Sequence, residues 1–208
     1  MKNKKQIVQG VVLTRTKVRN NILKVWKQAK ATERHDWYNE AHAFAQSLVY
    51  GYEAPDPRYY QDLNKVIGIL AATSPMKGWV QNKNVAAKIW QTGVFSGHTK
   101  AMCLKAKRIF DSSGEEAEIL DILNGQKISA FFLNIRHPQR DISLTMDRHA
   151  ICIALGKKHL SDCEMPALTV AQYEFFVECY RWTAAQLNIT GTLLQSATWV
   201  AHRRLKKS

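Results

Sequence analysis

The feature that most constrains the fold is a helical spacing of apolar residues, which recurs along almost the whole chain. Residues 10–31, for example, place Val18, Ile22, Val25 and Trp26 on one side of a helix. Strand signals are scarce: we find no Asn-Gly or Asp-Gly hairpin turn between two strand-like runs, and no sustained apolar–polar alternation bounded by turn residues. The sequence therefore predicts an all-α protein of about ten short helices.

Capping residues indicate where several of these helices begin. Asp56-Pro57 is typical of an N-cap followed by a proline at the first helical position. Thr169 with Gln172 has the spacing of a capping box, and so has Ser113 with Glu116. Asp147, which stands before an apolar run, is also among the best N-cap residues, so a purely structural role for it must be weighed first.

Length and cysteine usage limit the class of protein. The 208 residues suffice for one sizeable core or for two small lobes that share a cleft. No apolar run approaches the roughly 20 residues that cross a bilayer, and the first residues lack the apolar core of a secretory signal. The four cysteines (Cys103, Cys152, Cys163 and Cys179) lack zinc-like or cluster-like spacing. We therefore expect free thiols, a cytoplasmic location, and neither metal nor cofactor.

The charge of the chain is strongly and unevenly positive. Thirty Lys and Arg against seventeen Asp and Glu give a net charge of +13. Residues 1–30 hold nine basic and no acidic side chains, and Arg203-Arg204-Leu205-Lys206-Lys207 lies near the other end. Such clusters suit a polyanion such as DNA, because each neutralised phosphate releases counterions. A basic segment that only aids solubility is the alternative.

Two segments carry the residues with the clearest chemical potential. LNGQKISAFFLNI at 123–135 and LTMDRHAICIALG at 144–156 each place a charged side chain, Lys127 and Asp147, at the entrance of an apolar helix. A helix N-terminus disfavours a cation, so the position of Lys127 hints at another role. A partly desolvated lysine there could serve as a nucleophile.

These segments resemble those of the helix-hairpin-helix DNA glycosylases of the endonuclease III type. Gly125-Gln126-Lys127, an apolar helix and then Asp147 follow the family's order, and the likeness spans about residues 64–156. A group of short glycosylase-like proteins, chiefly from bacteriophages, is more similar still over nearly the whole chain. The shared features are Trp37-Tyr38 with Ala41-His42, Ser74-Pro75 with Trp79 and Asn82, Lys127 with Phe131, Phe132 and Asn134, Asp147 to Ala150, and Trp199-Val200.

The resemblance implies two helical lobes around a cleft, one over residues 64–156 and the other over 1–63 plus 157–208. It also implies extrusion of a nucleotide from DNA, with Asp147 stabilising the positive charge that develops on the sugar and Lys127 forming a Schiff base. The residues it assigns to DNA or substrate contacts are Ser74, Trp79, Asn82, Gly125, Gln126, Arg148, His149 and Arg203.

The chain departs from the endonuclease III pattern in two places. The family's hairpin has the sequence Leu-Pro-Gly-x-Gly, and its backbone amides bind a DNA phosphate. The corresponding segment of this chain is Asp121-Ile122-Leu123-Asn124-Gly125, which has only the second glycine. The cysteine quartet that holds an iron–sulfur cluster is also missing, so we expect no cluster.

Structural alternatives stay open for most of these residues. His149 fits a helix-turn hydrogen bond, Arg148 an ordinary surface arginine, and Trp79 the core. His202 with Arg203 and Arg204 fits either a DNA-facing helix end or a solubilising tail.

The leading expectation for function is a DNA glycosylase, with or without AP lyase activity, that acts in DNA repair or on modified bases. We expect it to be a monomer in a bacterial or phage-infected cell. Two alternatives remain: a phage enzyme of base hypermodification on the same scaffold, and a DNA-binding protein that has lost catalysis.

Overall fold

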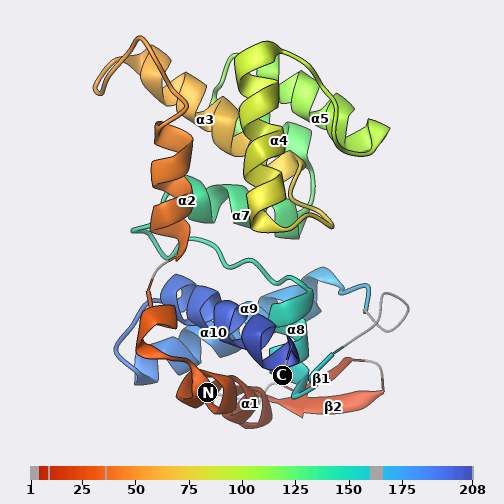
Figure 1. Cartoon of the computed structure of the whole chain (residues 1–208). Helices are drawn as coiled ribbons and strands as arrows, with labels where there is room; N and C mark the ends of the chain where they lie inside the picture. Colours follow the sequence, from red (N-terminus) through yellow and green to blue (C-terminus); the bar gives the residue numbers. More distant parts are fainter. Residues whose placement is uncertain (1–4, 9, 36, 160–165, 208) are drawn as a thin grey trace. The chain divides into compact units, whose positions relative to one another are not determined.

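The structure, a computed structural model, describes residues 5–8, 10–35, 37–159 and 166–207. The all-α prediction is confirmed, because within these residues helices dominate and the only strands form one short hairpin (Figure 1). No helix among them is long and apolar enough to cross a membrane. The elements are β1 (Lys5–Val8), β2 (Val11–Thr14), α1 (Arg15–Gln28), η1 (Ala31–Glu33), α2 (Trp37–Gln46), α3 (Pro57–Ala72), α4 (Trp79–Thr92), α5 (Lys100–Phe110), α6 (Glu116–Leu123), α7 (Gln126–Arg136), α8 (Arg148–Leu155), α9 (Val170–Gln186) and α10 (Gly191–Lys207).

The start of the chain differs from the helix expected over residues 10–31. Strands β1 and β2 pair antiparallel from Lys5 opposite Thr14 to Val8 opposite Val11. Their turn contains Gly10 at a φ of +73°, a conformation that glycine adopts without strain. The helix begins only at Arg15, where the Thr14 hydroxyl accepts a hydrogen bond from the Lys17 amide at 3.2 Å. The hairpin was missed because its turn lacks the Asn or Asp that makes the strongest turn signal.

The chain divides into two compact units. Unit 1 comprises Met1–Trp37 and Leu144–Ser208, and unit 2 comprises Tyr38–Ser143. In unit 1, α1 packs against α8, α9 and α10. Its core takes apolar side chains from the hairpin and from all four helices, among them Leu13, Val18, Ile22, Ile153, Phe176, Tyr180 and Leu194.

Unit 2 is organised around α3, which contacts α4, α5, α6 and α7. The second half of α3, residues 66–72, is buried throughout. Gly68 allows this close packing, because a Cβ at that position would lie 2.9 Å from methyl groups of both Ile109 and Ile119. Any larger residue at position 68 would have to displace these methyl groups where α3 meets α5 and α6.

The boundaries of these units differ from the expected lobes of 64–156 and 1–63 plus 157–208. Helix α8 packs on α1 and α10 and so belongs to unit 1, together with the preceding Asp147. Helix α2 after Trp37 and the start of α3 belong to unit 2. Periodicity reveals which face of a helix is buried but not which distant helix covers it, and this is why the boundaries shifted.

Candidate functional site

Asp147 is held by hydrogen bonds to both of its carboxylate oxygens. As the N-cap of α8, it accepts a hydrogen bond at Oδ1 from the Ala150 amide at 2.8 Å. Its Oδ2 accepts a hydrogen bond from Nε1 of Trp199, on α10, also at 2.8 Å. Each carboxylate oxygen can accept a further hydrogen bond. The half-buried carboxylate is thus fixed in orientation without being saturated.

Trp199 is surrounded by aromatic and cationic groups. Its ring lies 5.6 Å from that of Trp37 and 6.0 Å, edge to face, from the imidazole of His149. The guanidinium of Arg203 lies over the indole at 4.6 Å from the ring centroid. Trp199 therefore joins the carboxylate to a cation through one side chain.

Two imidazoles meet beside this tryptophan. The Nδ1 atoms of His149 and His202 are 3.1 Å apart, so one ring must donate the hydrogen bond and the other must accept it. Burial lowers the pKa of His149 to about 4, although Asp147 opposes that shift. Burial also lowers the pKa of His202. Both rings are therefore neutral at neutral pH. We call Asp147, His149, Trp199, His202 and Arg203 the carboxylate cluster.

The cluster gathers three of the sequence-predicted site residues, and the fourth in unit 1, Arg148, is half-buried at the first position of α8. Across the described ranges, no group of three or more His, Cys, Asp or Glu side chains could hold a metal ion. Three of the cysteines are buried free thiols (Cys103, Cys152 and Cys179), whereas Cys163 lies outside the described residues.

The other predicted site residues lie in unit 2. Helices α6 and α7 are joined by Asn124, at a φ of +42°, and by Gly125, the N-cap of α7. Gln126 and Lys127 form the exposed first turn of α7. The expected desolvation of Lys127 is therefore wrong: its side chain lies in solvent.

Of the upstream residues, Asn82 has a structural environment. Its side chain is only 2% exposed; it donates to the Leu70 carbonyl at 3.0 Å and accepts from the Thr73 hydroxyl at 2.8 Å. These bonds fasten α4 to the end of α3. Ser74 donates its hydroxyl to the Ala71 carbonyl at 2.9 Å, and the half-buried Trp79 packs edge to face on Phe44. A DNA-contacting role for Asn82 thus disagrees with its burial.

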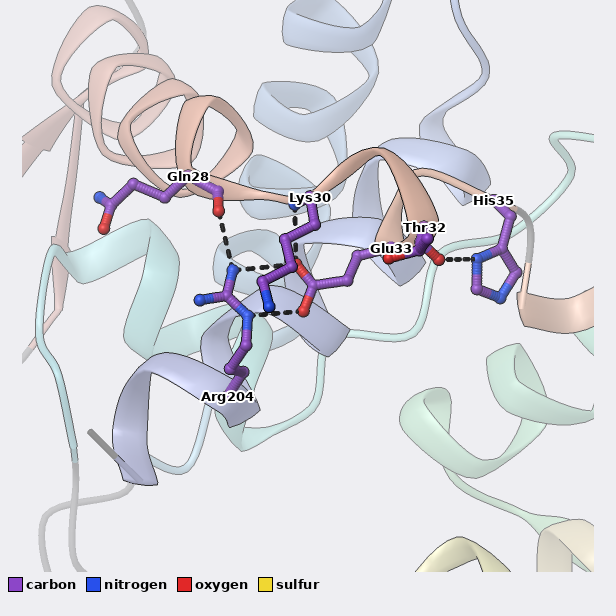
Figure 2. Close-up of polar contacts among 6 residues, drawn as sticks. All are labelled: Gln28, Lys30, Thr32, Glu33, His35 and Arg204. Carbon is purple, nitrogen blue, oxygen red and sulfur yellow. Dashed lines mark hydrogen bonds and ion pairs between the residues drawn. The ribbon is translucent and has the colours of Figure 1, made fainter.

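His202, Arg203 and Arg204 were expected to form a DNA-facing or solubilising helix end, and this is wrong for His202 and Arg204. His202 is 5% exposed. Arg204 forms a two-point ion pair with Glu33, at 2.7 and 2.9 Å, and donates to the Gln28 carbonyl at 2.8 Å (Figure 2). The hydrogen bond from Arg204 is the main reason why the pKa of Glu33 falls to about 2. The side chains of His202 and Arg204 thus help to pack α10 against the rest of unit 1.

Sequence reasoning did not place Trp199 or His202 beside Asp147. A signal was present, because Trp199, His202 and Arg203 have the i, i+3, i+4 spacing that brings side chains together on one helix face. The contact with Asp147 crosses 52 positions of sequence, however, and no local pattern predicts it.

The model of one protein family matches residues 4–206, and that family, DUF7178, is described as a family of unknown function. The chain belongs to DUF7178. The DUF7178 match includes the whole carboxylate cluster as well as Lys127. Neither the curated proteins nor the solved structures searched gave a match to the chain.

Proposed function

We propose that this DUF7178 protein is a DNA N-glycosylase that excises a damaged or modified base. The observation that carries the proposal is the Asp147 carboxylate, held by two N–H donors beside Trp199 and Arg203. Further support comes from the net charge of +13 and from the resemblance of the segment around Asp147 to the helix-hairpin-helix glycosylases. The protein acts as a monomer in the cytoplasm of a bacterial or phage-infected cell.

In this reaction the bond between C1′ of the sugar and the base nitrogen breaks, and its electron pair leaves with the base. Positive charge then develops on the sugar ring, where the Asp147 carboxylate stabilises it. Asp147 also takes the proton of the attacking water, which completes hydrolysis. The indole of Trp199 provides a face on which a base can stack, and Arg203 provides a cation for a phosphate.

The test is base release from a panel of modified DNA duplexes, with released bases measured by mass spectrometry. D147N keeps a good N-cap residue but removes the charge, so we expect release to fall at least about 100-fold. D56N is a matched control, because Asp56 caps α3 in unit 2 by accepting from the Arg58 amide at 2.8 Å. Release that D147N leaves unchanged, or that D56N abolishes equally, would contradict the proposal.

Lys127 is the proposed nucleophile of an accompanying AP lyase step. Its amine attacks C1′ of an abasic site and loses water to give a Schiff base, from which β-elimination cleaves the strand. Borohydride reduces this Schiff base to a stable covalent adduct. We expect the adduct with the wild type and with K100A, which removes an exposed lysine from the first turn of α5, but not with K127A. An adduct that persists in K127A would exclude this role.

A DNA-binding protein without catalysis is the second candidate. Two observations favour it: both Asp147 oxygens already serve structural hydrogen bonds, and the loop at Asn124-Gly125 lacks the full phosphate-binding glycine pattern. Salt-sensitive DNA binding with no base released from any duplex in the panel would establish it. Mass increase of a base without its release would instead indicate the hypermodification enzyme.

A further inference from the structure

The positive charge of the chain belongs almost entirely to one unit. Unit 1 has eighteen Lys and Arg against seven Asp and Glu, whereas unit 2 has twelve against ten. Lys127 and the Asn124-Gly125 loop thus lie in a nearly neutral unit. The attraction to a polyanion is concentrated in unit 1, the unit that holds Asp147.

Within unit 1, the solvent face of α1 is uniformly basic or neutral. Lys17, Lys24 and Lys27 are exposed, with Asn20 between them, and their spacing of i, i+7 and i+10 places them along one side of the helix. From Lys5 to Thr32 the chain contains no acidic residue. We call these three lysines the α1 lysine row.

The amines of the α1 lysine row make no ion pair or side-chain hydrogen bond within the described part of the chain. Several lysines of unit 2 are engaged by the protein instead. Lys107 pairs with Asp111, Lys105 donates to the Leu123 carbonyl, and Lys88 donates to the Ser96 hydroxyl. Three adjacent cations without counter-charges are available to an external anion.

The opposite face of α1 shows which anion fits. Val18 and Ile22 are fully buried in the core of unit 1, so the helix has no apolar side to insert into a bilayer. The row extends over about 15 Å, a length that matches several successive phosphates of one DNA strand. A nucleic-acid backbone therefore fits better than a lipid surface.

We propose that the α1 lysine row binds the sugar–phosphate backbone of nucleic acid. The Asn124-Gly125 loop between α6 and α7 is then not the main phosphate-binding element. This inference rests on the proposed function, in which DNA is the partner. It goes beyond that proposal by naming the surface that binds the DNA backbone.

The experiment measures binding of the full chain to a labelled duplex of about 20 base pairs by fluorescence anisotropy across a salt series. For K17Q/K24Q/K27Q we expect at least a tenfold weaker affinity at about 0.1 M salt, and a log–log salt slope smaller by about 2.7. The matched control K88Q/K100Q/R108Q removes three exposed charges from unit 2 and retains the wild-type slope. Circular dichroism verifies that both variants are folded.

Each outcome bears on one claim. Equal losses in the two triple variants would show that only net charge matters, and would overturn the inference. So would unchanged binding by K17Q/K24Q/K27Q, or lysine-dependent binding to phosphatidylserine vesicles in place of DNA. Base release is a separate readout: a wild type that binds through the row but releases no base refutes the glycosylase and leaves this surface standing.

Discussion

At the scale of single residues, the bond between Trp199 and Asp147 can be tested apart from the packing of the tryptophan. W199F keeps an aromatic ring but removes the indole donor to Oδ2. We expect the free energy of unfolding to fall by about 1–3 kcal/mol, and base release to fall as well because the carboxylate loses an orienting donor. W90F is the control, since Trp90 donates to the Leu48 carbonyl at 2.9 Å in unit 2. Equal release rates for the two folded variants would rule out the orienting role.

The imidazole pair predicts a dependence of stability on pH. The pKa of His149 is about 4 in the folded chain against an ordinary value of 6.5, so between these values the unfolded chain binds more protons. Stability is therefore full above pH 6.5 and is lost as the pH falls toward 4, by about 1–2 kcal/mol after allowance for the partial exposure of the ring.

The measurement for this prediction is urea unfolding at pH 5 to 7. Glu33 does not interfere, because its pKa of about 2 and ordinary value of 4.5 place its titration at lower pH. H149Q should flatten the pH dependence, whereas H35Q, at an exposed position, should keep it. An H149Q variant that is as acid-sensitive as the wild type would disprove the assignment.

At the scale of elements, Glu33 fastens η1 to α10 through Arg204 (Figure 2). E33Q removes the charge and leaves Arg204 without its ionic partner, so we expect the urea midpoint to fall by an amount equivalent to about 1–2 kcal/mol. E174Q, which removes an exposed carboxylate from α9 in the same unit, should change it by less than about 0.5 kcal/mol. If E33Q and E174Q lower the urea midpoint by the same small amount, the Glu33–Arg204 ion pair does not stabilise the contact between η1 and α10.

Helix ends were the part of the fold that local sequence predicted best. The caps at Asp56 and Thr169 are confirmed, including the capping box between Thr169 and Gln172. The capping box proposed for Ser113 and Glu116 is wrong: α6 starts at Glu116, and Ser113 instead bonds Glu118 through both its amide and its hydroxyl. A helix cap depends on residues a few positions away in the sequence, so local sequence usually predicts where a helix begins. The usual error is a boundary misplaced by one or two residues.

The site was predicted less completely, for a physical reason. Asp147 and His149 stood out because charged groups interrupt an apolar run. Their partners Trp199 and His202 lie on α10, and the contacts depend on how α10 packs against α8. How α10 packs against α8 depends on all the side chains in the core of unit 1, and no local sequence pattern predicts it.

At the scale of the whole molecule, the division into units predicts that residues 38–143 fold by themselves. This stretch is continuous and has its own buried core around α3. We expect the isolated fragment to be helical and to unfold cooperatively in urea. G68A in that fragment should destabilise it by about 1–3 kcal/mol, because the added Cβ meets Ile109 and Ile119 at 2.9 Å. A fragment that melts without a transition would contradict this independence.

Unit 1 is assembled from two stretches separated by the whole of unit 2, and this has a consequence for the order of events at the ribosome. Translation produces Asp147 well before the indole that orients it, so a nascent chain that stalls short of α10 holds an incomplete set of reactive groups. In the enzyme that we propose, a chain that stops before α10 lacks both Trp199 and Arg203, so we expect it to release bases more slowly than a chain that includes α10.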